Sequence, residues 1–148
     1  MCIRDRALDV IIAMNTGHDG SMTSIHGASP RDALDRLVTL AAMAGERLSE
    51  VVLTKMVART MEITIQLAFD PVSHGRRVVA IYEVAGLETS ADGSPVITGH
   101  DLWTRDPTRD RLEWTGVQPR CLRKIAAHGV RYALPATERG ADPQAAAT

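Results

Sequence analysis

Residues 16–26 hold the densest group of side chains suited to chemistry, with the sequence T-G-H-D-G-S-M-T-S-I-H. His18 and His26 flank a stretch rich in glycine and hydroxyl groups. Imidazole N–H, hydroxyl and glycine backbone N–H groups are all hydrogen-bond donors, which phosphate oxygens require. One interpretation is therefore a phosphate-facing site, in which both histidines and the donors between them meet a phosphate group.

Two other interpretations of the same segment stay open from the residues alone. His18, Asp19 and His26 could ligate a metal ion, although their spacing is not a standard one and no cysteine joins them. Hydroxyl side chains in loops also commonly bond to their own backbone, so the segment could be purely structural. The residue types do not choose among these three possibilities.

The flanking residues predict the elements that position this segment. Apolar residues at helical spacing predict the end of a helix over residues 7–14. Residues 15–20 are small and polar with two glycines, which predicts a loop. Residues 21–26 predict a short buried strand, with His26 on its edge.

A strong helix start follows the segment. Ser29 is the predicted N-cap, Pro30 occupies the first helical position, and Asp32 lies three residues after the cap. Gly45 is the predicted stop. The predicted apolar face of this helix consists of Leu34, Leu37, Val38 and Ala41.

The second half of the chain predicts one more helix, a hairpin and a short closing helix. Residues 49–60 predict a helix in which Val51, Val52 and Met56 are apolar. Strict alternation predicts a strand over residues 63–69. The remaining predicted elements are a returning strand at 77–84, a third strand at 96–104, and a helix at 119–128 that ends at Gly129 and turns Leu122 and Ile125 inward.

Composition narrows the class of protein. The chain has 148 residues, with 45% hydrophobic and 24% charged residues, an ordinary balance for one globular domain. A net charge of -1 gives no general reason to expect direct nucleic-acid binding. Cys2 and Cys121 lie far apart and are interpreted as reduced thiols. Without an apolar run of about 20 residues or a signal peptide, the chain is expected in the cytoplasm.

Residues 16–26 closely resemble the His box of the type II/IV secretion ATPase superfamily, whose pattern runs approximately T-G-H-x-G-S-x-T-T-x-H-A. The CpaF-type ATPases of tight-adherence (Tad) pilus assembly are most similar, both in A-M-N-T-G-H-D-G-S at 13–21 and in S-P-R-D-A-L at 29–34. V-V-A-I-Y-E-V-A-G at 78–86 resembles the family's V-x-x-I-x-E-V-x-G strand. T-G-V-Q-P at 115–119 resembles its closing T-G-x-x-P helix.

The resemblance covers residues 7–134 and implies both a fold and an activity. The expected fold is α/β: the C-terminal half of a RecA-like P-loop ATPase domain, incomplete, with an antiparallel hairpin extension. The expected activity is ATP hydrolysis with Mg²⁺ by a homohexamer that powers pilus assembly or type II/IV secretion. The implied partners are inner-membrane platform proteins, which would place the enzyme at the cytoplasmic face of that membrane.

The resemblance also implies roles for individual residues. His26 is the expected γ-phosphate sensor and His18 is expected to position the loop, so these two are the candidate catalytic residues. The expected nucleotide-proximal residues are Gly17, Gly20, Ser21, Thr23, Ser24 and Arg36, and no metal ligand is assigned. Two departures are Ser24, which keeps the hydroxyl of the usual Thr, and Gly27, which replaces Ala and is expected to loosen the exit from the strand.

The chain has no G-x-x-x-x-G-K-[ST] phosphate loop and no Walker B segment, and neither Lys55 nor Lys124 follows a glycine loop. The fragment alone is therefore expected to be inactive. Residues 1–6 are interpreted as a non-native leader that resembles translated adapter sequence, and residues 135–148 as a disordered tail. Two alternatives are a fragment of a type IV secretion or conjugation ATPase, and a non-catalytic scaffold domain that docks on such a ring.

Overall fold

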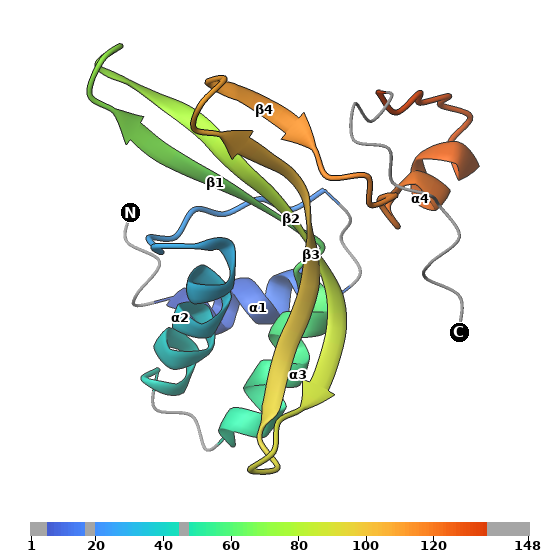
Figure 1. Ribbon diagram of the computed structural model, residues 1–148. Coiled ribbons are helices and arrows are strands. Elements are labelled where there is room, and N and C mark those ends of the chain that lie inside the picture. The colour runs from blue at the N-terminus through green and yellow to red at the C-terminus, as the bar shows by residue number, and fades with distance from the viewer. Residues whose placement is uncertain (1–5, 17–19, 45–47, 136–148) are drawn as a thin grey trace.

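The computed structural model describes residues 6–16, 20–44 and 48–135, which form a helix layer packed against a four-stranded sheet (Figure 1). The strand order is β1-β2-β3-β4, and each described strand pairs antiparallel with the next one along the chain. The mixed α/β class and the antiparallel hairpin are thus confirmed. Among the described residues, no helix is long and apolar enough to cross a membrane.

The first two helices form as their sequences predict. Helix α1 spans Ala7–Asn15, and helix α2 spans Pro30–Ala42. The backbone N–H of Asp32 donates to Ser29 Oγ at 3.1 Å, which is the predicted N-cap. The four predicted apolar positions of α2 are all buried. The predicted stop at Gly45 lies outside the described residues.

Helix α3, Glu50–Thr60, agrees with the helix predicted over residues 49–60, and Ser49 is its N-cap. Of the three apolar residues named for this helix, only Met56 packs against the core cluster. Val51 and Val52 are exposed, whereas Leu53 and Val57 are almost fully buried. Leu53 and Val57 are four residues apart and therefore share a helix face, and that face is the one turned to the sheet.

The sheet contains the three predicted strands and one that was not predicted. The strands are β1 (Ile63–Asp70), β2 (Gly75–Thr89), β3 (Pro95–Asp106) and β4 (Arg111–Trp114). Strand β2 continues five residues past its predicted end because it pairs with β3 there. Strand β4 was missed because it has only four residues and follows a turn at Asp110, a non-glycine residue with φ of 51°.

The predicted buried strand at residues 21–26 is wrong. These residues form no regular secondary structure, and Met22 is 93% exposed. Among the described strands none pairs with this segment, and a strand without a partner leaves its backbone groups to water. Only Ile25 packs against the core.

Helix α4, Leu122–Ala127, is shorter than predicted and contains no buried residue. Leu122 and Ile125 are only partly buried, so the prediction that both turn inward holds in part. Gly129 has φ of 76°, a left-handed conformation that ends the helix as predicted. Figure 1 places α4 to the side of the sheet, apart from the layer of α1, α2 and α3.

The core lies between the three helices and one face of β2 and β3. Its members include Ile11, Leu37, Leu53, Tyr82 and Ile97. The face of the sheet that points away from the helices is also apolar. Residues opposite each other in an antiparallel pair lie on the same face of the sheet. On that face Ile65 pairs with Ile81, and Ile81 pairs with Trp103. The predicted leader and tail lie almost wholly in residues 1–5 and 136–148, outside the described residues.

Candidate functional site

The candidate segment starts at the end of α1. The Thr16 hydroxyl donates to the Ala13 carbonyl at 2.6 Å and so closes the last turn of that helix. Gly17, His18 and Asp19 lie outside the described residues. Gly20 has φ of 88°, which glycine adopts without strain and other residues rarely do.

The hydroxyl-bearing residues of the segment lie on the surface. Ser21, Thr23 and Ser24 are all exposed, and His26 is exposed as well. Their donors are therefore within reach of a ligand or of another polypeptide that covers this part of the chain. This exposure fits a site that a ligand or another polypeptide completes.

His26 lies between two attachment points. On one side Ile25 packs against the core cluster. On the other side the Gly27 carbonyl accepts a hydrogen bond of 3.0 Å from Gln66 Nε2, which is on β1. His26 is thus held by its neighbours, although the strand expected to hold it is absent.

Gly27 is packed tightly against α2, which corrects the expectation that it loosens the chain. A Cβ atom built on Gly27 would lie 2.8 Å from the Ala33 backbone and from its Cβ. Real Cβ atoms essentially never show contacts this short, so a side chain at Gly27 would force the neighbouring backbone to shift. The glycine therefore lets the segment and the helix meet.

The segment leads directly into the N-terminus of α2. The Ala28 backbone N–H donates to Asp32 Oδ2 at 2.7 Å, and the Asp32 N–H donates to Ser29 Oγ. These reciprocal bonds resemble a capping box and fix the angle at which the chain enters the helix. A displacement of His26 would therefore act on α2 within three residues.

Arg36 is exposed on α2, and no hydrogen bond or ion pair joins it to the described part of the candidate segment. The neighbouring Asp35 is exposed, but partial desolvation of its carboxyl group raises its pKa, with the Arg31 charge acting in the opposite direction. No described hydrogen bond or ion pair therefore joins Arg36 to His26.

A metal site remains open as an interpretation. Within residues 6–16, 20–44 and 48–135, no group of three His, Cys, Asp or Glu side chains is placed to hold a metal ion. His18 and Asp19, two of the three suggested ligands, are outside these ranges.

Sequence reasoning missed a contact that joins two distant parts of the chain. Glu83 is 3% exposed, and its carboxylate accepts the backbone N–H groups of Arg120 at 2.9 Å and Cys121 at 3.1 Å. Glu83 belongs to the V-V-A-I-Y-E-V-A-G stretch, and the two donors follow directly after T-G-V-Q-P. The glutamate in an otherwise apolar strand was the available signal, because a buried carboxylate requires donors.

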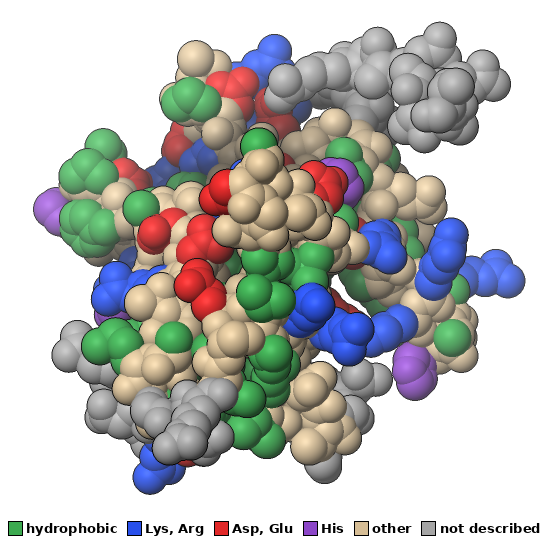
Figure 2. Space-filling model, turned by 90° about the horizontal axis from the view of Figure 1, so that it is seen from below, with side chains coloured by type: hydrophobic (Ala, Val, Ile, Leu, Met, Phe, Trp, Pro, Cys, Tyr) green, Lys and Arg blue, Asp and Glu red, His purple; other side chains and the backbone are tan. Residues whose placement is uncertain are grey.

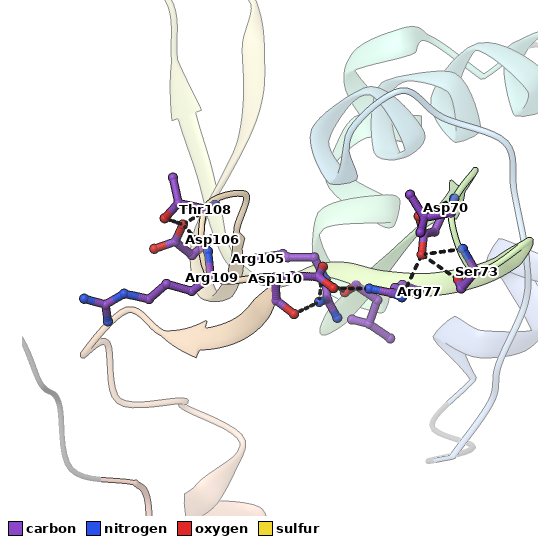
Figure 3. Close-up of polar contacts among 10 residues, drawn as sticks. Asp70, Ser73, Arg77, Arg105, Asp106, Thr108, Arg109 and Asp110 are labelled. Carbon is purple, nitrogen blue, oxygen red and sulfur yellow. Dashed lines mark hydrogen bonds and ion pairs between the residues drawn. The ribbon is translucent and has the colours of Figure 1, made fainter.

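A second polar cluster links the tips of the two hairpins (Figure 3). Arg77 forms an ion pair of 2.7 Å with Asp70 and another with Asp110, and Asp110 also pairs with Arg105 at 3.1 Å. The hydrogen bond from Arg77 lowers the pKa of Asp110, and the Ser73 hydroxyl is the main cause that lowers the pKa of Asp70. The cluster ties β1–β2 to β3–β4 and contains none of the candidate site residues.

The chain matches no protein-family model, and it likewise matches none of the curated proteins with which it was compared.

Proposed function

We propose that this chain is the C-terminal portion of a type II/IV secretion ATPase, most similar to the CpaF-type enzymes of Tad pilus assembly. The intact protein would form a homohexamer at the cytoplasmic face of the inner membrane and hydrolyse ATP to drive assembly or secretion with platform proteins. The described part would be one half of a RecA-like domain, and its sheet would continue with upstream strands.

One observation carries this proposal. The exposed, donor-rich segment at residues 20–26 is anchored at its C-terminal end and leads directly into the capped helix α2. His26 is exposed, yet Ile25 and Gly27 on either side of it are attached to the core, to β1 and to α2. An ATPase that senses its γ-phosphate needs a donor that meets the phosphate and is coupled to a rigid element.

The proposed mechanism assigns sensing to this chain and nucleotide binding to upstream segments. His26 donates a hydrogen bond to the γ-phosphate or to the water beside it, while Ser21, Thr23 and Ser24 supply neighbouring donors. When the phosphate leaves, the segment loses this partner, and the change is passed to α2 through Gly27 and Ser29. His18 positions the first half of the loop.

Neither phosphate-loop lysine nor Walker B carboxylate occurs in the sequence, so Mg²⁺ is assigned no ligand here. We therefore propose that the 148-residue chain alone neither binds ATP tightly nor turns it over. Phosphate release above background from a pure preparation of the chain would contradict this part of the proposal.

The test of the proposed function uses the enzyme restored with its upstream sequence. His26→Ala is expected to lower kcat by about 10²-fold and to leave ATP affinity nearly unchanged, because it removes one positioned donor. His18→Ala is expected to have a smaller effect. His100→Ala, which removes an exposed histidine of β3, is the matched control and is expected to be neutral.

Three results would contradict the assignment in whole or in part. A fully active His26→Ala enzyme with an inactive His18→Ala enzyme would reverse the two roles. If neither substitution changes kcat, the His box is structural in this protein. If the upstream sequence holds no phosphate loop at all, the scaffold alternative replaces the ATPase, and neighbouring genes for conjugation would favour the type IV branch.

A further inference from the structure

The last described segment of the chain is strongly basic, although the whole chain is not. Residues 115–135 contain no Asp or Glu, and the entire protein has a net charge of -1. The Lys and Arg residues of this segment are Arg120, Arg123, Lys124 and Arg131. In Figure 2, Lys and Arg side chains gather on the side of the molecule where Figure 1 places α4.

Polar contacts attach this segment to the sheet. Helix α4 buries none of its residues. Glu83 holds the turn before α4 through two backbone N–H groups, Arg120 Nη1 donates to the Ala85 carbonyl at 2.5 Å, and Lys124 forms an ion pair with Glu62. Because apolar packing does not draw α4 down onto the sheet, space remains beneath it.

That space is an open hollow of about 700 Å³ between the sheet and the segment. Its apolar lining comes from Val84, Pro119 and Leu122. Its charged lining consists of Glu62, Glu83, Arg120, Arg123 and Lys124.

The two acidic groups of the hollow already have partners, whereas the guanidinium groups of Arg120 and Arg123 can accept a further anionic partner. Glu83 accepts two backbone N–H groups, and Glu62 pairs with Lys124. The Arg120 guanidinium has only a neutral carbonyl as its described partner. The Arg123 backbone N–H donates to the Arg120 carbonyl, but no hydrogen bond or ion pair joins the Arg123 guanidinium to any described residue. Two guanidinium groups are thus available to a carboxylate ligand.

We propose that this hollow, which we call the α4 hollow, docks an acidic peptide segment of a partner protein. Carboxylates of the peptide pair with Arg120 and Arg123, and an adjacent apolar side chain lies on Val84, Pro119 and Leu122. The concave shape favours a peptide over a bilayer, because a flat lipid surface cannot enter a hollow. This docking site goes beyond the proposed ATPase function and does not depend on it.

The test measures binding of a fluorescein-labelled peptide, (Glu-Glu-Leu)₄, to the 148-residue chain by fluorescence anisotropy at low salt. We expect saturable binding that weakens as salt increases, and no binding of (Lys-Lys-Leu)₄. Arg123→Glu is expected to raise Kd at least about tenfold, since it replaces an attractive charge with a repulsive one. Arg76→Glu changes the net charge equally at the far end of β1–β2 and is expected to leave Kd unchanged.

Several outcomes would overturn the proposal. Equal weakening by Arg76→Glu and Arg123→Glu would show a bulk charge effect, and unchanged binding by Arg120→Ala/Arg123→Ala would place the peptide elsewhere. Tight binding to phosphatidylserine vesicles without peptide binding would assign the basic segment to a membrane instead. Circular dichroism of each variant checks that it is folded, and because Arg123 is exposed on a short helix, its substitution is not expected to disturb the core.

Discussion

Gly27 shows how one small residue couples a candidate site to the structure around it. The absence of a side chain lets the segment lie directly against Ala33, and the Gly27 carbonyl is at the same time held by Gln66. In the sequence, a glycine in place of alanine suggested looseness. In three dimensions it is the residue that permits the closest contact between the segment and α2.

Gly27→Ala is therefore expected to destabilise the protein by about 1–3 kcal/mol, because the new Cβ must displace the backbone of α2. Gly75→Ala is the control. A Cβ atom at Gly75 would meet nothing closer than 3.6 Å, so that substitution is expected to be nearly neutral. Urea unfolding of the three proteins measures the difference, and equal midpoints for both variants would contradict the close packing at Gly27.

At the scale of elements, Glu83 provides the buried contact that attaches the turn before α4 to the sheet. Glu83→Gln keeps the shape of the side chain, but its amide N–H₂ would face at least one of the two backbone N–H groups that donate to the carboxylate. An unsatisfied buried donor costs about 1–3 kcal/mol. Amide hydrogen exchange at Arg120 and Cys121 is expected to become about tenfold or more faster, because this part of the chain opens more often.

The control for this experiment is Glu88→Gln, which changes an exposed glutamate near the end of β2. It is expected to leave exchange in residues 119–127 as in the parent protein. If Glu83→Gln also leaves that exchange unchanged, the other polar contacts hold the segment without it.

The hairpin-tip cluster predicts a specific dependence of stability on pH. The folded state lowers the pKa of Asp110 below its unfolded value of about 3.9. A lowered folded pKa adds stability that is fully present above the unfolded value and is lost as pH falls through the folded value. The melting temperature should therefore decrease as the pH is lowered from about 4, in part through this residue.

Asp110→Asn removes the charge of Asp110, so it should lower stability near neutral pH. It should also reduce the acid limb, by which we mean the decrease in melting temperature as the pH falls below about 4. Asparagine tolerates the positive φ of this position, so the substitution tests the charge and not the turn. Melting curves between pH 2.5 and 7 provide the measurement, with Asp101→Asn on β3 as the control. An acid limb identical to that of the parent protein would exclude Asp110 as a contributor.

The elements that the sequence predicted are those with local signals. Ser29 indicated a helix start because its hydroxyl bonds to a backbone N–H three residues away, and β1 was evident from alternation. Strand β4 and the irregular segment 21–26 were not predicted correctly, because both depend on which strands find partners. Pairing between segments far apart in the chain leaves little trace in local composition.

The same limit applies to the candidate site. The hydrogen-bond donors of residues 20–26 could be predicted from their residue types, and the Ser29–Asp32 cap from its spacing, but the exposure of residues 21–24 could not, because a buried strand was predicted there. The Gln66–Gly27 and Glu83–Arg120 hydrogen bonds could not, because each joins residues more than 35 positions apart. Where His18 lies relative to His26 stays a prediction.

For the whole molecule, the uncovered face of the sheet is the main liability. Ile65, Leu67 and Phe69 are 57%, 51% and 63% exposed on β1, which is an edge strand. An exposed apolar edge strand is a template for association with other chains. The purified chain is therefore expected to self-associate as its concentration rises.

A variant with Ile65→Thr, Leu67→Thr and Phe69→Thr should remain monomeric while keeping its helix content, because threonine suits a strand and these side chains pack little. Sedimentation velocity over a concentration series measures this, with Val72→Thr in the exposed hairpin turn as the control. If the triple variant associates as strongly as the parent chain, the β1 face is not the cause.

The order of strands in the sheet has a consequence for how quickly the protein forms. Among the described strands, β1, β2 and β3 each pair with the next strand along the chain, so this sheet needs only short loop closures. Hairpins of this kind form on the microsecond scale, and each one can close as soon as its second strand has left the ribosome. The slower step is then the docking of α1, α2 and α3, which are synthesised first but must wait for β2 and β3 to cover them.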